Sequence, residues 1–358
     1  MSTAVENYLK IYKMQRRGAH IGSGGQRAER AILEAIQLRA GRPHSRELRL
    51  GIGDDCALLL PRPGEELCLT TDLSIAGRHF RLDWHPPEAI GHRVLARGLS
   101  DVAAMGARPV AAFLSLGLPA DRTRVRSGQR AWVDRFLDGM LELARAHQTP
   151  LAGGDLAESP LALADIVLVG AAPQGKALLR SGASAGDALY VTGQLGGAAA
   201  GLELLSRQPE TRRKAIAAGR IPAGLRAPLQ PHLYPQPRLR QGQWLVRRGA
   251  ATAAIDLSDG LSTDLTHLCE ESQLAAEVDA AALPIHAGAT LVQALHGGED
   301  YELLFTAAES VRIPATIAGV PVTRIGRMTP PRRGHARITL RTSEVSQPLM
   351  PQGWEHFR

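Results

Sequence analysis

Short apolar segments, rarely longer than six residues, restrict the fold of this chain more than any other feature of its sequence. Five of them are β-rich and bounded by Gly, Pro or Asp: 48–52, 56–60, 67–69, 111–116 and 166–171. Helical patterns lie before and between them, over 27–39, 87–105 and 129–146. Because strands and helices mix without a regular βαβ order, we expect an α+β fold.

The chain has 358 residues, enough for about two domains. A polar, glycine-containing loop, RSGASAGD, begins at residue 180, and a strand pattern over 188–192 follows it. We therefore expect an N-terminal extension over 1–26, an N-terminal domain over 27–177 and a C-terminal domain over 178–358.

Several classes of protein are disfavoured by composition. No apolar run approaches the roughly 18 residues of a membrane span, and the N-terminus lacks the apolar region of a signal peptide. The cysteines, Cys56, Cys68 and Cys269, form no CxxC pair, so neither a disulfide scaffold nor a zinc site is indicated. These features favour a cytoplasmic protein.

The basic charge is local. The net charge is +7, yet residues 1–50 carry +6 and residues 207–250 carry +9, so the rest of the chain carries −8. A nucleic-acid-binding protein would use these two basic segments, but a solvated surface excess is the commoner cause. Aromatic residues make up only 4%, which disfavours single-strand binding by base stacking.

Acidic residues recur at the ends of apolar segments, beside Gly, Ser or Thr. The six motifs are GIGDD (51–55), TTD (70–72), SD (100–101), GGD (153–155), SDG (258–260) with Asp264, and GGEDYE (297–302). A single Asp-Gly is usually a turn, but six such sites in one chain predict carboxylates gathered around a cation. Hard oxygen ligands favour Mg²⁺, which substrate phosphates commonly complete, so a nucleoside triphosphate is indicated.

Two familiar phosphate-binding signatures are missing from the sequence. It contains neither GxxxxGK[ST] nor the HRD/DFG set of protein kinases. GQLGGAAAG (193–201) does not match GxGxxG, and we interpret it first as a tight turn with close packing.

Taken in order, seven motifs resemble the thiamine-monophosphate kinase family of the aminoimidazole ribonucleotide synthetase superfamily. They are GIGDDCALL, TTDLSIAGRHF, LSDVAAMGARP, AGGDL, LLRSGASAGDALYVTG, IDLSDGLSTDLTHL and GGEDYELLF. The resemblance implies an N-terminal domain with a mixed or antiparallel sheet and a C-terminal α/β-sandwich domain. It also implies ATP-dependent phosphorylation of thiamine monophosphate to thiamine diphosphate with several Mg²⁺ ions. The expected assembly is a homodimer joined through the N-terminal sheets, without nucleic-acid or membrane partners.

The resemblance assigns roles to individual residues. The implied Mg²⁺ ligands are Asp55, Thr70, Thr71, Asp72, Asp101, Asp155, Asp259 and Asp264. The implied nucleotide contacts are Gly154, Asp155, Arg180 and Thr263, and the implied thiamine-phosphate contacts are His79, Glu299 and Trp354. Leu156 after GGD and Arg78 before His79 depart from the family pattern, which affects the details of ligand contacts rather than the reaction.

Some of these residues also have an ordinary structural interpretation. Asp54 is expected to cap its turn and leave Asp55 as the ligand, and Glu302 is expected to be structural. By the residues alone, His79 would be a buried, hydrogen-bonded histidine, and Arg180 a surface residue whose guanidinium also suits phosphate.

The implied reaction needs no catalytic side chain. A phosphate monoester has its second pKa near ~6 and is largely ionised at pH 7, so direct in-line transfer requires no general base. The alternatives are another ATP-using member of the superfamily, for which a suitable catalytic Cys or Lys near the N-terminus is lacking, and the nucleic-acid-binding protein.

Overall fold

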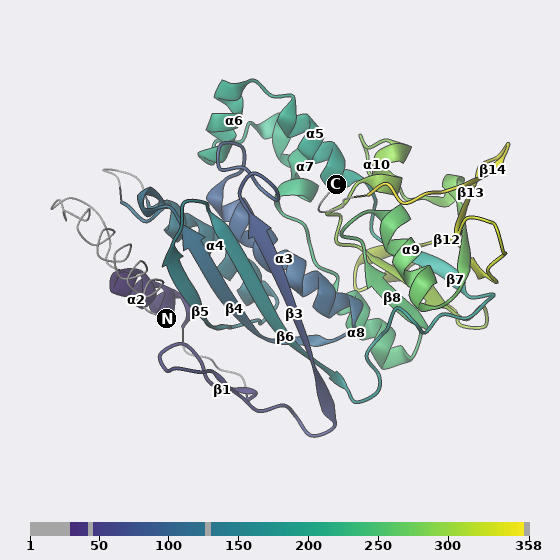
Figure 1. The fold of residues 1–358 in the computed structure, drawn as a ribbon, viewed down its shortest axis with the longest axis horizontal. Helices are drawn as coiled ribbons and strands as arrows, with labels where there is room; N and C mark the ends of the chain where they lie inside the picture. Colours follow the sequence, from purple (N-terminus) through teal and green to yellow (C-terminus); the bar gives the residue numbers. More distant parts are fainter. Residues whose placement is uncertain (1–28, 42–45, 126–129, 354–358) are drawn as a thin grey trace, which may run out of the picture.

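The fold is taken from a computed structural model that describes residues 29–41, 46–125 and 130–353. The expected extension over 1–26 and Trp354 lie outside the described residues. The elements form two α+β domains side by side, with helices α5 to α7 above the junction (Figure 1). This arrangement confirms the predicted fold class.

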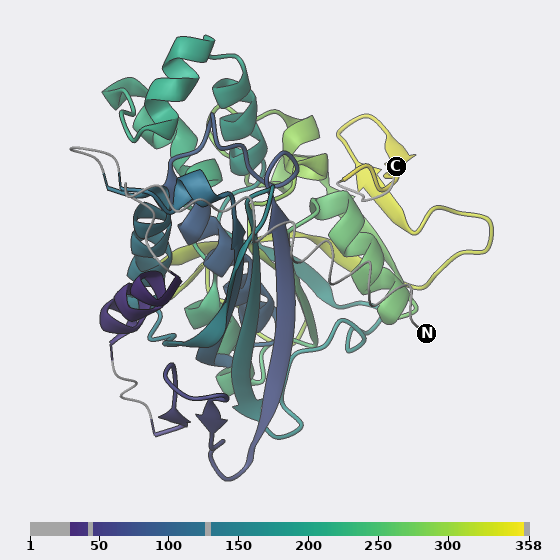
Figure 2. The same cartoon turned by 60° about the vertical axis from the view of Figure 1, so that its left-hand side comes forward.

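The N-terminal domain is a four-stranded sheet covered on one face by helices (Figures 1 and 2). Its strand order is β3-β6-β4-β5, with the bounds β3 (Glu65–Ile75), β6 (Leu163–Pro173), β4 (Arg108–Leu118) and β5 (Leu151–Glu158). The covering helices are α3 (Pro87–Ala104), α4 (Trp132–Ala146) and the shorter α2 (Glu29–Ala40). A small ribbon of β1 (Leu48–Leu50) and β2 (Leu58–Leu59) lies beside the sheet.

Two glycines allow α3 and α4 to pack backbone against backbone. A Cβ atom on Gly91 of α3 would lie 1.9 Å from the carbonyl oxygen of Phe136, and one on Gly139 of α4 would lie 1.9 Å from that of Glu88. No side chain fits at such a distance, so glycine at both positions sets the closeness of this helix pair.

The C-terminal domain is an eight-stranded, mainly antiparallel sheet. Its order is β14-β13-β9-β12-β7-β10-β8, and β11 pairs with β12. The strands are β7 (Ala188–Thr192), β8 (Ala253–Asp256), β9 (Ala275–Asp279), β10 (Leu303–Ala307), β11 (Thr316–Ile317), β12 (Val320–Thr329), β13 (Ile338–Arg341) and β14 (Ser346–Pro348). The helices are α5 (Gly197–Ser206), α6 (Glu210–Ala217), α7 (Ala223–Leu233), α8 (Leu239–Arg248), α9 (Leu261–Glu271) and α10 (Leu291–His296).

One hydrophobic core spans both domains through α3. Leu99 of α3 belongs to the same buried cluster as Leu168 of β6 and as Leu303 and Phe305 of β10. The helix therefore carries its side chains to both sheets, and residues of α3 stand at the junction where the site is found.

One expectation about strand length was wrong. TTD (70–72) was expected after a strand, whereas β3 runs through it, and GGD (153–155) lies within β5, a strand that was not expected. β3 continues because its side chains keep alternating between the helix-covered and the exposed face, and β6 pairs with it over its whole length.

Candidate functional site

A cavity of about 450 Å³ opens at the junction of the two domains. It is lined by the loop that follows β3, by α3, α5 and α7, and by the GGEDYE loop. Carboxylates form one end: Asp72, Asp101, Asp256 and Asp259. Apolar and imidazole groups form another part of the wall: Trp84, His85, Ala198, Ala199, Leu202 and His232.

Asp72 and Asp101 meet because β3 turns its even-numbered side chains toward α3. Arg97 of α3 donates to Asp72 Oδ1 from Nη2 at 2.8 Å, and the Thr70 hydroxyl donates to Asp101 Oδ2. Burial raises the pKa of the Asp101 carboxyl, and the neighbouring Asp72 charge raises it further. Three predicted ligands, Thr70, Asp72 and Asp101, are thus brought together.

Asp256, at the end of β8, joins this cluster and was not predicted from the sequence. Ser100 Oγ of α3 donates to its Oδ2 at 2.7 Å. Burial and the Asp101 charge raise its pKa to about 7. The signal was present in the sequence, since AAID precedes the SDG motif, but only the later acids of that motif were selected.

The SDG motif places its acids at the start of α9. Asp264 Oδ2 accepts the backbone N–H groups of Asp259 at 3.1 Å and Gly260 at 3.0 Å. Asp264 is buried, and burial followed by the charges of Asp256 and Asp259 raises its pKa well above the usual value. Thr263 Oγ1 accepts a hydrogen bond from the N–H of Gly353 at 3.1 Å, and this contact fixes the chain at Gly353 next to Asp259.

A second cavity of about 510 Å³ reaches the same carboxylates from another side. Thr70, Asp101 and Asp256 line its wall, and Arg180 stands there with an exposed side chain. Arg180 lines the same cavity as Asp101 and Asp256, and its positive charge partly opposes the rise in the pKa of both carboxyls.

Other predicted site residues lie elsewhere in the single chain. Asp155 and Gly154 are on β5, the opposite edge of the sheet from β3, three strand spacings or about 14 Å from the row of Asp72. Asp55 is exposed on its loop, where its N–H binds Asp54 Oδ1, as expected of a turn-capping Asp54. The Thr71 hydroxyl donates to Asp165 at 2.8 Å on the exposed face of the sheet.

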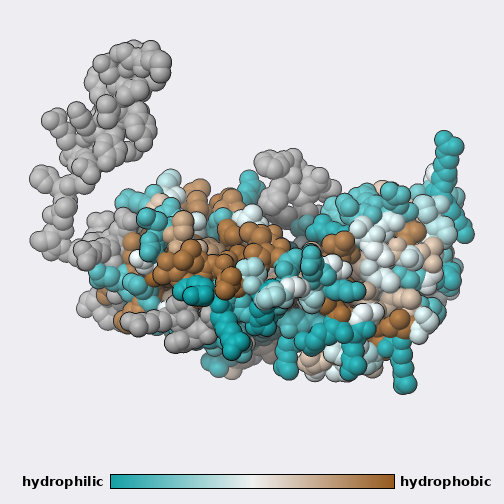
Figure 3. All heavy atoms as spheres, turned by 90° about the horizontal axis from the view of Figure 1, so that it is seen from below, coloured by the Kyte–Doolittle hydropathy of each residue, from teal (hydrophilic) through white to brown (hydrophobic). Residues whose placement is uncertain are grey.

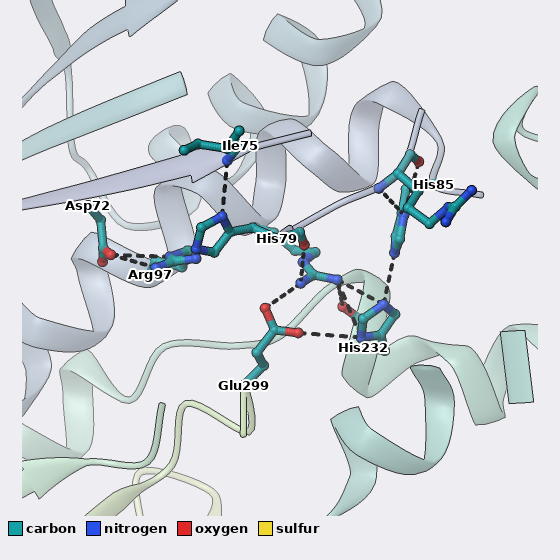
Figure 4. A network of polar contacts seen from close by, with 9 residues as sticks. Asp72, Ile75, His79, His85, Arg97, His232 and Glu299 are labelled. Atoms are coloured by element: carbon teal, nitrogen blue, oxygen red, sulfur yellow. Dashed lines mark hydrogen bonds and ion pairs between the residues drawn. The ribbon is translucent and has the colours of Figure 1, made fainter. Parts of the chain in front are cut away.

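The two described thiamine-phosphate candidates, His79 and Glu299, both line the main cavity (Figure 4). His79 Nδ1 accepts the N–H of Ile75 at 3.1 Å, so the imidazole is fixed against the end of β3. Arg93 of α3 forms an ion pair with Glu299 and also donates to the His79 carbonyl at 3.2 Å. Sequence reasoning missed Arg93, Arg97 and the nearby histidines, because nothing in a helical pattern distinguishes them from solvated charges.

The remaining motifs have structural partners. Gly196 and Ala198 of the GQLGGAAAG turn donate their N–H groups to Asp300 at 2.6 Å and 3.1 Å, so these donors are already occupied. Glu302 is buried in an ion pair with Arg238 and accepts from the Thr192 hydroxyl at 2.7 Å, which confirms its structural role.

The donor set matches a hard cation, although the protein alone does not enclose one. Among the described residues, no three His, Cys, Asp or Glu side chains are gathered closely enough to hold a metal ion by themselves. The oxygen ligands and the mutual repulsion of Asp101 and Asp256 fit Mg²⁺, which usually takes one or two carboxylates and leaves other positions to water and phosphate.

In the described part of the chain, no helix is long and apolar enough to cross a membrane.

Comparisons with known proteins identify the family of this chain. Two family models match the chain: "AIR synthase related protein, N-terminal domain" over residues 53–172 and "AIR synthase related protein, C-terminal domain" over residues 184–339. The chain is 40% identical over 323 residues to the thiamine-monophosphate kinase of Escherichia coli K12, covering 87% of this chain and 93% of that protein. It is 30% identical over 326 residues to that of Bacillus subtilis, covering 88% and 95%. The chain therefore belongs to the AIR synthase related family, in which it groups with the thiamine-monophosphate kinases.

Solved structures give the same result. A thiamine-monophosphate kinase from Stenotrophomonas maltophilia superposes with a TM-score of 0.72 at 36% identity, covering 88% of this chain and 96% of that one. A second structure, AaThiL complexed with AMPPCP and TMP, superposes with a TM-score of 0.69 at 29% identity, covering 92% and 97%. The hydrogenase maturation protein HypE in complex with ATP, at 21% identity and a TM-score of 0.67, shares the fold.

Proposed function

We propose that this enzyme transfers the γ-phosphoryl group of ATP to thiamine monophosphate and forms thiamine diphosphate. One observation carries the proposal: a single cavity joins the carboxylate cluster of Asp72 and Asp101 to the pocket of His79 and Glu299. The carboxylate cluster suits a metal-bound phosphate chain, and the pocket of His79 and Glu299 suits an organic substrate. The relatives named for this activity, and the neighbour that holds an ATP analogue together with thiamine monophosphate, support the same conclusion.

The carboxylates are proposed to hold Mg²⁺. Asp72, Asp101 and Asp259 line the cavity, Thr70 bonds to Asp101, and Asp264 supports the Asp259 turn. Bound there, Mg²⁺ would offset the repulsion between two polyanions and stabilise charge on the group in transfer. We add Asp256 to the proposed ligands because it belongs to the same cluster.

The chain's own residues mainly position the reactants. The acceptor phosphate is already ionised near neutral pH, so no side chain has to remove a proton from it. Arg180, at the second cavity, is placed to pair with nucleotide phosphate, for which a planar guanidinium is well suited. Arg97 holds Asp72 Oδ1 and leaves Oδ2 as the oxygen available to a ligand.

Gly154, Asp155, Thr263 and Trp354 keep their proposed ligand roles. Gly353 is fixed to Thr263 beside Asp259, so the described part of the chain ends next to the wall of the cavity. Trp354 lies outside the described residues, and its proposed role is to attract the thiazolium ring of thiamine to the face of its indole. We also retain the two-domain boundaries, the homodimer and Mg²⁺ dependence as proposals.

A coupled assay of ADP release tests the reaction. We expect turnover with thiamine monophosphate, and little with thiamine, whose acceptor is an alcohol, or with aminoimidazole precursors. Equal turnover of thiamine and its monophosphate would contradict a pre-ionised phosphate acceptor. Activity only with an aminoimidazole precursor would instead place the enzyme with another superfamily reaction, and a salt-sensitive gel shift without kinase activity would favour nucleic-acid binding.

A further inference from the structure

Arg93 connects the two substrate-pocket residues. Its side chain, only 5% exposed, lies on α3, and its Nη2 both pairs with Glu299 Oε1 and donates to the His79 carbonyl at 3.2 Å. A guanidinium carries five donors in a rigid plane, so one residue can bind several acceptors at fixed angles. Arg93 therefore fixes the loop after β3 and the GGEDYE loop relative to each other.

The other nitrogen of Arg93 contacts His232 on α7. Nη1 lies 2.9 Å from His232 Nε2 and 3.3 Å from Nδ1, and it donates to the His232 carbonyl at 3.2 Å. Because a guanidinium can only donate, the unprotonated nitrogen of the neutral ring is the acceptor. Nδ1 of His232 lies 3.7 Å from Glu299 Oε2.

His85 completes the arrangement. Its Nε2 lies 2.9 Å from His232 Nε2, so one of these two nitrogens carries a proton and donates to the other. Its Nδ1 lies 3.0 Å from the backbone nitrogen and 3.1 Å from the carbonyl oxygen of Arg81, so Nδ1 has a backbone partner in either tautomer. Burial lowers the pKa of His85 to about 3, and burial and the Arg93 charge lower that of His232 as well. Both rings are neutral at pH 7, with opposite tautomers.

We propose that Arg93, His232 and His85 are positioning residues that hold Glu299 with Oε2 directed at the cavity, where it accepts a hydrogen bond from the aminopyrimidine of the substrate. Arg93 occupies Oε1, whereas Oε2 lies beyond hydrogen-bonding distance of His232 and keeps its capacity to accept. The substrate's identity rests on the proposed function; the positioning does not.

The backbone around Glu299 indicates that the side chains fix its position. Glu299 has φ +67° and Tyr301 has φ +50°, both in the left-handed region. Non-glycine residues adopt this region at an energetic cost and persist there when surrounding contacts hold them. The contacts of Arg93 and the burial of Tyr301 supply that support.

This assigns a role to the basic, proline-rich segment 207–250. His232 comes from it, and so does Arg238, which forms the buried ion pair with Glu302. Arg93 and His92 of α3 hold the segment in turn, the latter by its Nε2 at 2.7 Å from the Pro235 carbonyl. The segment thus contacts both glutamates of the GGEDYE loop.

Histidine tautomers test the positioning without any substrate. In long-range ¹H–¹⁵N spectra of the full chain at pH 7, we expect both rings to be neutral and to have opposite tautomers, one with its proton on Nε2 and the other with its proton on Nδ1. A charged His232, or the same tautomer at both rings, would overturn the inference whether or not the enzyme phosphorylates thiamine monophosphate. If the tautomers are as expected and the wild type does not use thiamine monophosphate, only the proposed function fails.

Substrate binding tests the consequence. His232→Leu removes the acceptor for Arg93, and we expect it to raise the KM and the calorimetric Kd for thiamine monophosphate about tenfold while those for ATP change less than about twofold. His232→Gln, whose amide oxygen can replace the accepting ring nitrogen, should recover part of the loss. Arg93→Lys, with one ammonium in place of the fork, should resemble His232→Leu.

The matched control is His267→Leu on α9, a half-exposed histidine outside the cavity, which should leave both constants unchanged. If His232→Leu shifts the constants for ATP and thiamine monophosphate equally, or if His232→Gln is no better than His232→Leu, the positioning role is wrong. If His232→Leu does not fold, Arg93→Lys takes its place in this comparison. The criterion is the same: the KM and Kd for thiamine monophosphate should rise about tenfold, while those for ATP change less than about twofold.

Discussion

At the scale of single residues, the carboxylate cluster is a place where negative charges are held together against their repulsion. Burial raises the pKa of Asp101 and that of Asp256, and the charge of a neighbouring acid raises each pKa further. Such an arrangement is expected where a cation binds during function. The charge of each side chain, rather than its shape, should therefore determine activity.

Asp101→Asn keeps the shape and removes one charge. We expect turnover to fall by at least about a hundredfold, since even groups one step removed from a metal ligand cost about 10–100-fold when replaced. The fold should survive, as measured by circular dichroism and the melting temperature. The control is Asp138→Asn, a half-exposed residue on α4 outside the cavity. Near-normal turnover of Asp101→Asn at limiting Mg²⁺ would contradict the ligand assignment.

Asp300 makes stability depend on pH. Burial raises its pKa to about 7, although two backbone N–H groups favour the ionised form. A carboxyl whose pKa is higher in the folded state stabilises the fold most below about pH 4, and this contribution is lost as the pH rises through about 7. The amide that replaces the carboxyl in Asp300→Asn does not titrate, so this variant lacks the pH dependence.

We therefore expect the free energy of unfolding of the wild type, relative to that of Asp300→Asn, to decrease between about pH 4 and 7 by up to about 1.4 kcal/mol per pH unit. Above about pH 8 the difference should be constant. Urea unfolding at several pH values measures it, and curves that stay parallel from about pH 4 to 8 would contradict the raised pKa.

At the scale of elements, the α3–α4 pair fixes the position of the helix that supplies Arg93, Arg97, Ser100 and Asp101. Gly139→Ala places a Cβ atom where the Glu88 carbonyl now lies, and overpacking of this kind typically costs about 1–3 kcal/mol. We expect a lower melting temperature, measured by scanning calorimetry.

Gly224→Ala is the matched control, because Gly224 lies in helix α7 with no atom within 4 Å of an added Cβ. It should be neutral or stabilising, since Ala is the better helix former. Equal losses in both variants would show that the α3–α4 contact is not the cause.

The elements also show what could be predicted from the sequence. Where an apolar pattern is local, the agreement is close: the strand expected over 188–192 is β7, and the helix expected over 87–105 is α3. Helix α7 was missed because Pro228 and Pro231 lie inside it, which disfavours a helix. It forms because Leu229 and Leu233 are buried in a cluster with Leu205 of α5, a tertiary contact invisible in the local pattern.

The same limit applies to the site. Asp72, Asp101, Asp259 and Glu299 could be selected because short motifs mark them, and the structure places them at one cavity. The residues that hold them, Arg93, Arg97 and His232, come from helices whose sequences carry no such mark. Arg93 and Glu299 are 206 residues apart in the sequence, and only the fold brings the pair together.

At the scale of the whole molecule, the N-terminal sheet presents an apolar face to solvent. Leu67, Leu69 and Leu73 share one face of β3 with exposed fractions of 39%, 69% and 47%. Figure 3 shows apolar surface gathered on the N-terminal half of the molecule, while the other half is mostly hydrophilic. Contiguous apolar surface of this kind marks an interaction site, and it supports the proposed homodimer through the sheets.

A dimer would also affect the interpretation of Asp155 and Asp55. Within one chain Asp155 lies at the far edge of the sheet from Asp72. If these acids serve the reaction, a second subunit is the way to bring them to a carboxylate cluster. Oligomeric state and activity should then change together.

Leu69→Glu tests this connection. A charge in the middle of an apolar interface is costly to desolvate, so we expect the variant to be monomeric by analytical ultracentrifugation at micromolar concentration, where the wild type is dimeric. The fold should persist, because Leu69 is 69% exposed in the single chain. The control is Leu38→Glu on α2, where the side chain is 84% exposed; this variant should remain dimeric like the wild type.

We expect the Leu69→Glu monomer to lose most ADP release. A fully active monomer would show that Asp55 and Asp155 of a second subunit are not needed, and a wild type that is itself monomeric would refute the proposed dimer.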